Sequence, residues 1–132
     1  GAAAVEFNSY LCVAGGDDGL TLLNTVDCYR SSSSSSSSGA WLSLPPMLHP
    51  RRGAGLAVFQ GRLCVVGGES DKTVIPFAEC LTVDRARATS NNANVAGVWE
   101  SLPPMSVPRA WAGVSILSIP SSSSSSSSAS AS

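Results

Sequence analysis

The chain has 132 residues, of which 13% are charged, and its formal net charge is −1. This length suits one ordinary domain, and the charged fraction is well below the roughly 25% of typical soluble domains. The near-neutral balance gives nucleic-acid binding no electrostatic support. No apolar run approaches about 18 residues and no charged-then-apolar leader opens the chain, so we expect neither a transmembrane helix nor a signal peptide.

Short apolar segments that end at glycine or proline predict a series of β-strands and an all-β fold. Residues 1–8 are small and mildly apolar, and suit either a frayed lead-in or the end of a preceding strand. Further strands are expected at residues 9–14, 22–30, 41–44, 52–59, 62–66, 77–83, 98–102 and 111–117.

The clearest of these segments ends at a pair of glycines. Val65 and Val66 favour a pleated, half-buried surface, and the run stops at Gly67-Gly68. Glycine lacks Cβ, so the backbone here can adopt a positive φ or pass close to another backbone. Gly61 separates this strand from the preceding one and suits a tight hairpin turn.

The same pattern occurs twice, and an internal period of this length indicates a repeat fold. The members that recur at an offset of 52 are Gly15-Gly16 and Gly67-Gly68, Cys12 and Cys64, Asp27 and Glu79, Cys28 and Cys80, and Tyr29 and Leu81. Those that recur at 58 are Trp41 and Trp99, Pro45-Pro46-Met47 and Pro103-Pro104-Met105, and Arg51 and Arg109. The change of offset places a length difference of six residues in the loop before the tryptophan.

A diglycine, an acid before a cysteine, a tryptophan and a Pro-Pro-Met…Pro-Arg run, in this order, resemble the kelch repeat. The sequence is most similar to the kelch domains of BTB–kelch ubiquitin-ligase adaptors, and the resemblance covers residues 10–117 without the serine run. The resemblance implies four-stranded antiparallel blades of a β-propeller. Propellers typically contain about 4–8 blades, so this chain would supply about two blades of a larger one. The structural residues of the repeat would be Gly15, Gly16, Tyr29, Trp41, Arg51, Gly67, Gly68, Trp99 and Arg109.

The repeat divides the chain into five parts. They are a lead-in (1–8), a blade with three strands (9–49), a complete blade (50–105), the first strand of the next blade (106–120) and a serine-rich tail (121–132). Runs of eight serines occupy residues 31–38 and 121–128, and the polar loop 84–97 takes the place of the first run in the second repeat. The runs could be natural low-complexity sequence, an engineered spacer or stand-ins for residues of unknown type.

The cysteines could form disulfides or bind zinc, but neither is the expected outcome. They lie at matching strand positions spaced 16 apart, without a C-x-x-C pair and with a single histidine in the chain. Because zinc sites need clustered ligand pairs, we expect free, buried cysteines that act as small apolar residues. Unpaired thiols within strands indicate a reducing compartment, so we expect a cytoplasmic, or else nuclear, protein.

The resemblance implies a protein-interaction module that binds a protein or peptide with loops on one face, as in the substrate-recognition part of a ubiquitin-ligase adaptor. The loops concerned are residues 17–20 and 69–73, which are acidic, and the crossings 48–52 and 106–111, which are basic. A peptide with both charges would suit such a face. The candidate partner-binding residues are Asp17, Asp18, Glu69, Asp71, Lys72, His49, Arg52 and Trp111.

Two other functions are considered: a purely structural propeller segment and, less favoured, a kelch-fold enzyme. Copper oxidases of this kind need tyrosine, histidine and cysteine ligands, and this chain has one histidine and two tyrosines. His49 has neither a nucleophile nor an orienting acid beside it in the sequence, and no phosphate loop or nucleophile elbow is present. We expect no catalysis, cofactor or metal, and no nucleic-acid or membrane partner.

The charges of the repeat are expected to have structural roles. Asp27, Glu79, Arg51 and Arg109 would pair acid with arginine within or between blades, because a partly buried acid needs a partner.

The tryptophans differ in their expected roles. Trp41 and Trp99 recur and should pack between blades, since each buries a large area. Trp111 is aligned with Gly53, and is expected to be either an anchor at the binding rim or buried by an adjacent blade. Since a blade buries its faces against neighbours, we expect the chain to need the remaining blades, in the same chain or from copies of itself.

Overall fold

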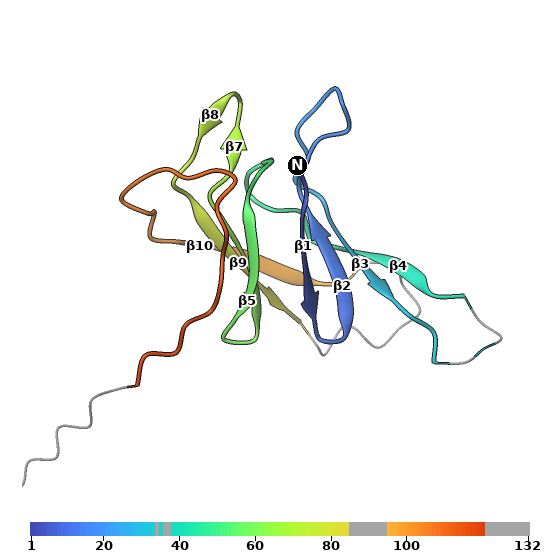
Figure 1. The fold of residues 1–132 in the computed structure, drawn as a ribbon. Helices are drawn as coiled ribbons and strands as arrows, with labels where there is room; N and C mark the ends of the chain where they lie inside the picture. Colours follow the sequence, from blue (N-terminus) through green and yellow to red (C-terminus); the bar gives the residue numbers. More distant parts are fainter. Residues whose placement is uncertain (34, 36–37, 85–94, 121–132) are drawn as a thin grey trace, which may run out of the picture.

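Short antiparallel strands and tight turns build the part of the chain that the structure describes, with no helix in it (Figure 1). The structure is a computed structural model that describes residues 1–33, 35, 38–84 and 95–120. Most of the polar loop 84–97, the second serine run and the remaining tail lie outside the described residues. The expected all-β class, with strands in four-stranded antiparallel sheets, is confirmed.

The first sheet, called the first blade here, has the strand order β1-β2-β3-β4. Its strands are β1 (Ala3–Phe7), β2 (Tyr10–Ala14), β3 (Val26–Arg30) and β4 (Ala40–Leu44). Residues 1–8 were expected to be a lead-in or a strand end, and they contain β1, which pairs with β2 along its whole length. The first blade therefore has four strands rather than the expected three.

The second sheet, called the second blade, has the strand order β10-β9-β6-β5. Its strands are β5 (Gly55–Phe59), β6 (Arg62–Val66), β9 (Ala78–Val83) and β10 (Gly97–Leu102). A small hairpin of β7 (Glu69–Ser70) and β8 (Thr73–Val74) extends from it, where the sequence indicated only an acidic loop.

Three expected strands differ from the structure, and one of them, predicted at 52–59, begins only at Gly55 because Arg52 forms an isolated bridge with Glu69. Residues 111–117 were expected to start a third blade, but they are described and contain no strand. A strand needs a partner for its backbone hydrogen bonds, and no strand of either sheet pairs with this segment. The predicted strand at 22–30 begins only at Val26, because Leu22 forms an isolated bridge with Asp17 instead.

The hairpins have the expected tight turns. Gln60 and Gly61 join β5 to β6 with φ of 50° and 71°, and Asn8 and Ser9 join β1 to β2 with φ of 51° and 66°. Positive φ at both central residues is typical of the type I′ turn, whose twist matches that of the strands. The hairpin turn predicted at Gly61 is confirmed.

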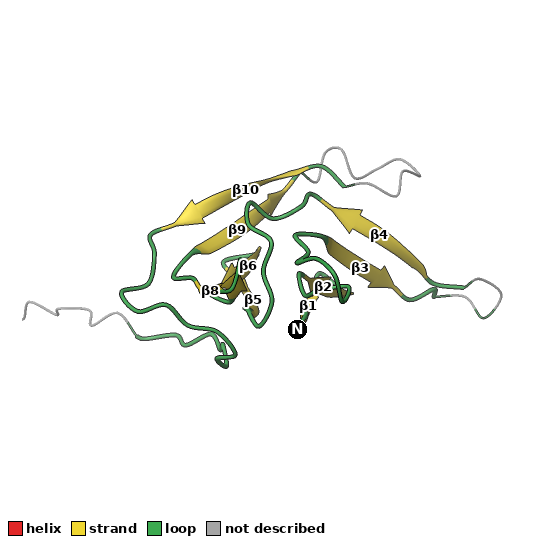
Figure 2. Ribbon diagram, turned by 90° about the horizontal axis from the view of Figure 1, so that it is seen from above, coloured by secondary structure: helices red, strands yellow, loops and turns green. Residues whose placement is uncertain are grey.

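The hydrophobic core lies between the two blades. Viewed from above, the blades lie side by side, with β1 and β5 neighbouring each other and β4 and β10 at the other end (Figure 2). Alternate side chains of each blade enter this core. Its buried members are Phe7, Cys12, Ala14, Val26, Cys28, Leu44, Met47, Leu56, Leu63, Val65, Leu81 and Trp99.

The diglycines hold the chain that links one blade to the next. Gly15 and Gly67 have φ of 62° and 64°, and a Cβ on either would collide with a backbone carbonyl, that of Arg51 or of Arg109 respectively. The following glycine of each pair donates its N–H to the same carbonyl, at 2.8 Å in the first blade and 2.7 Å in the second. The close backbone approach predicted from the sequence is therefore confirmed.

The expectation of free cysteines is wrong. Cys12 is bonded to Cys28, and Cys64 to Cys80, and the described residues include no free cysteine. The register explains this, because each pair occupies directly opposite positions on neighbouring strands, with Cα atoms 4.0 and 4.1 Å apart. Disulfides persist chiefly in oxidising environments, so the cysteines give no support to the expected cytoplasmic location.

Candidate functional site

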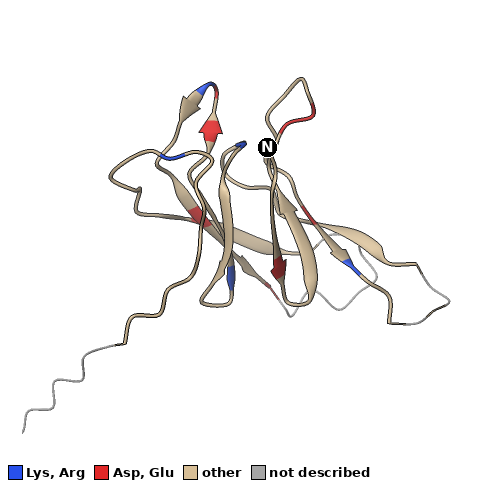
Figure 3. Ribbon diagram, in the orientation of Figure 1, with Lys and Arg blue, Asp and Glu red and all other residues tan. Residues whose placement is uncertain are grey.

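An open cleft lies between loops of the two blades. It has a volume of about 510 Å³ and is bordered by the loop after β2, the link before β5 and the β7–β8 hairpin. Figure 3 shows charged residues of these segments at the same end of the molecule. The lining residues are Asp17, Gly19, Leu20, Thr21, Leu22, Pro50, Arg52, Glu69, Asp71 and Lys72.

The first-blade wall of the cleft is a loop that is braced by its own polar groups. Asp17 forms an isolated bridge with Leu22, which closes the loop at its base. The carboxylate of Asp18 accepts hydrogen bonds from the backbone N–H groups of Leu20 and Thr21, at 2.9 and 2.8 Å. These bonds, that from Thr21 foremost, lower the pKa of Asp18. The side chain of Leu20 is 94% exposed, so the loop presents an apolar tip to the solvent.

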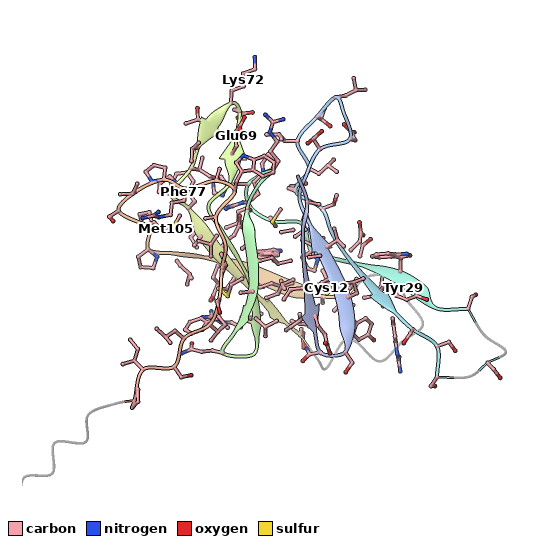
Figure 4. All side chains as sticks on the ribbon, viewed as in Figure 1. Cys12, Tyr29, Glu69, Lys72, Phe77 and Met105 are labelled. Carbon is pink, nitrogen blue, oxygen red and sulfur yellow. A yellow bond between two sulfur atoms is a disulfide. The ribbon has the colours of Figure 1, made fainter. Side chains whose placement is uncertain are left out.

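The second-blade wall is the β7–β8 hairpin. Asp71 and Lys72 form its turn with φ of 47° and 66°, and Figure 4 shows Lys72 pointing away from the tip, with Glu69 below it. Arg52 and Glu69 exchange both backbone hydrogen bonds, at 3.0 and 2.8 Å. Their side chains also form an ion pair of 2.8 Å. The link between the blades is thus fastened to the hairpin.

The cleft combines charges of both signs. Three carboxylates (Asp17, Glu69 and Asp71) and two cations (Arg52 and Lys72) line it. The Arg52 side chain is 39% exposed although it is paired with Glu69, so it remains accessible to a second carboxylate. Such an arrangement can hold a ligand by hydrogen bonds and ion pairs. Because these ion pairs are exposed to solvent, the affinity for the ligand should fall as salt is added.

The other candidate residues do not line this cleft. Asp18 faces its own loop, as described above. His49 stacks on Phe77 with ring centroids 5.1 Å apart, and its backbone N–H donates to Glu79 at 3.3 Å. Trp111 packs its ring against Gly53 and is 67% exposed. The sequence left two alternatives for Trp111, an anchor at the binding rim or burial by an adjacent blade, and in the structure its side chain is exposed.

The repeat charges pair between a link and a blade. The guanidinium of Arg51 forms an ion pair with the carboxylate of Glu79 on β9, and both side chains are buried. The same guanidinium donates to the carbonyls of Gly67 and Phe77, at 2.7 and 3.0 Å. Burial lowers the pKa of Arg51, and the charge and hydrogen bond of Glu79 oppose this shift. The structural pairing expected for these two residues is confirmed.

Their counterparts in the other repeat are not paired with each other. Asp27 accepts a hydrogen bond of 2.7 Å from Ser43 Oγ, and Arg109 is exposed. Likewise Trp99 is buried between the blades, as expected, but Trp41 is 56% exposed. Among the described residues, the acid–arginine pairing expected for Asp27 and Arg109 and the burial expected for Trp41 are thus not found.

A scan against models of known protein families found no match, and a search of curated proteins found none either. Within the described ranges no helix is long and apolar enough to cross a membrane. The same ranges contain no cluster of three or more histidine, cysteine or acidic residues that could hold a metal ion.

Proposed function

We propose that this chain is a protein-interaction module of the kelch type, which binds an extended peptide segment carrying both acidic and basic side chains. The observation that carries this proposal is the charged cleft between the loop after β2 and the β7–β8 hairpin. The loops extend from two sheets, each of which is cross-linked internally by one disulfide. Binding residues are commonly found on loops that a rigid scaffold positions.

The chemistry of the cleft favours a peptide over a small apolar ligand. Small-molecule sites are mostly enclosed and lined by apolar side chains, whereas this cleft is open and five of its lining residues are charged. Leu20 offers an apolar contact at the rim, where an apolar side chain of the peptide would pack. By its resemblance to BTB–kelch adaptors, the same face would receive the substrate of a ubiquitin ligase.

A phage-displayed library of random peptides tests the proposal. Peptides selected on the chain should be enriched in sequences with both acidic and basic residues. An Arg52→Ala and Lys72→Ala double variant should weaken binding of the selected peptides at least about tenfold, because it removes both cations of the cleft. Fluorescence polarisation with labelled peptides measures this loss, and the affinity of the unchanged chain should fall as salt is added.

Arg62→Ala serves as the matched control. Arg62 carries the same charge, but it is the first residue of β6, next to the turn between β5 and β6, and does not line the cleft. Its side chain pairs with Glu100, at 3.6 Å. Its removal should leave peptide affinity unchanged. If selected peptides bind the double variant as well as the unchanged chain, or if none is selected, the cleft is not the binding site.

A purely structural propeller segment is the second candidate. The observation that favours it is the exposure of Trp41 and Leu11 on the outer face of the first blade, where another blade would fit. In that case no peptide would be selected on the loop face.

A further inference from the structure

Several pairs of equivalent residues in the two repeats differ in burial. In these pairs the member that lies between the blades is buried, whereas its counterpart on an outer face is exposed; the cysteines are an exception, because all four are buried. The pairs are Leu63 and Leu11 (0% and 50% exposed), Trp99 and Trp41 (7% and 56%), and Arg51 and Arg109 (1% and exposed). Since each pair has the same place in the repeat, the difference shows which surfaces have a neighbouring blade and which have none.

One contact between the blades is made by a tryptophan. Trp99 Nε1 donates a hydrogen bond of 2.7 Å to the carbonyl of Pro45, at the end of the first blade. The counterparts of this donor and acceptor are Trp41 and Pro103, and both are exposed. The ring of Trp41 lies against Tyr29 of its own blade instead, with ring centroids 5.4 Å apart. The chain therefore carries a second copy of this donor and this acceptor, at opposite ends of the molecule.

A second contact between the blades is the buried ion pair of Arg51 and Glu79. Arg109, the counterpart of Arg51, is held by its own blade in the same way. The carbonyl of Arg51 accepts the N–H of Gly16, and that of Arg109 accepts the N–H of Gly68. Arg109 is thus fixed on the second blade as Arg51 is fixed on the first.

The acceptors that Arg109 would need are present on the first blade. The carboxylate of Asp27 matches that of Glu79, although its side chain is one methylene shorter. The carbonyl of Thr25 accepts from Gly15 at 3.0 Å, just as the carbonyl of Phe77 accepts from Gly67 at 2.9 Å.

We infer that copies of this chain associate head to tail, with the second blade of one copy against the outer face of the first blade of the next. Arg109 of one copy would pair with Asp27 of its neighbour, and the neighbour's Trp41 would donate to the carbonyl of Pro103. A second copy fits because this chain carries both halves of the contact. Such a heterologous contact closes into a ring when the rotation allows it, and a propeller of about 4–8 blades would take two to four copies.

One segment has to move for this contact. Residues 111–120 lie beside the second blade without joining its sheet, and Val114 occupies the space in front of Gly55. Most of its apolar side chains remain exposed, among them Ile116, Leu117 and Ile119 at 51%, 81% and 81%. A neighbouring blade would have to displace the part of the segment beyond Trp111, whose backbone N–H donates to the carbonyl of Gly53 at 2.7 Å.

Sedimentation velocity on the full chain over a range of concentrations tests the inference. The unchanged chain should associate reversibly into species of two to four copies. Arg109→Glu alone and Asp27→Arg alone should each place like charges in the contact and should weaken association at least about tenfold. Trp41→Phe removes the indole donor and should act in the same direction. Arg30→Ala is the matched control, because Arg30 is exposed at the end of β3 and outside the contact.

Mixing the two charge variants separates a lost contact from a damaged fold. Each variant should be monomeric alone, and an equimolar mixture should associate again, because every contact between unlike variants then joins opposite charges. An unchanged chain that stays monomeric at every concentration would overturn the inference, and the faces would then meet other blades or another protein. A mixture that fails to associate would overturn it as well.

Discussion

The buried pair of Arg51 and Glu79 joins the blade link to the second blade. Glu79 also accepts the backbone N–H groups of Leu48 and His49, at 2.6 and 3.3 Å, so its carboxylate gathers three parts of the link. A charge taken out of water is costly unless all its hydrogen-bonding groups have partners. All the partners of this carboxylate belong to the link. The position of the second blade therefore depends on the contacts between Glu79 and the link.

Removing one partner of this pair should therefore be severe. Glu79→Ala leaves the Arg51 guanidinium buried without its counter-charge and should lower the free energy of unfolding by about 3–5 kcal/mol. Glu69→Ala is the comparison, because the Arg52–Glu69 pair is partly exposed and should be worth only about 0–1 kcal/mol. Urea unfolding followed by tryptophan fluorescence measures both, and equal losses would contradict the structural role of Arg51 and Glu79.

The central hairpins of both blades are cross-linked in the same way. In each blade the disulfide joins the second strand of the sheet to the third, β2 to β3 and β6 to β9. The first bridge lies in the core between the blades, and Cys64 and Cys80 of the second are also buried. Each closes a chain separation of 16 residues, so each restricts the unfolded chain to a similar degree.

Loss of each disulfide should then lower the free energy of unfolding by a comparable amount. A loop of this length corresponds to about 3 kcal/mol per bridge. Chemical unfolding with and without a reducing agent, and of the Cys12→Ala/Cys28→Ala and Cys64→Ala/Cys80→Ala variants, measures each contribution. Before that, maleimide labelling of the unfolded, unreduced chain should find no reactive thiol, and labelling at all four cysteines would contradict the bridges.

At the scale of the whole molecule, two blades share one core, and the outer face of the first blade has no neighbour among the described residues. The inner positions of the repeat are filled, as Leu63 and Trp99 show, while Leu11 and Trp41 face the solvent. Exposed apolar surface of this kind commonly marks an interaction site. The stability of a single chain and its association are therefore linked.

Thermal unfolding should reveal this link. Since association stabilises the folded state by mass action, the Tm of the unchanged chain should rise with protein concentration. The Tm of the Arg109→Glu variant should stay nearly constant over the same range. Differential scanning calorimetry at several concentrations measures both, and identical concentration dependence in the two proteins would argue against association through Arg109.

Local sequence determined most of the strands and turns. The apolar run around Val65 and the glycine at position 61 predicted β6 and its hairpin, because both depend on neighbouring residues alone. The glycine pairs predicted a positive φ or a close backbone approach, and the resemblance to the kelch repeat implied that the loops 17–20 and 69–73 belong to one binding face. These loops meet in one cleft because of how the two blades pack. The resemblance implied this packing, whereas the local sequence pattern carries no information about it.

Tertiary structure alone decided the remaining features. The cysteines pair because the register sets Cys12 opposite Cys28, and register is fixed by pairing across the sheet rather than by spacing in the chain. Residues 111–117 have the pattern of an inner strand, but they pair with no strand of either sheet, although Val114 lies against Gly55 of the edge strand β5. Trp41 and Trp99 have equivalent places in the repeat and opposite burial, since burial depends on whether a second surface is present.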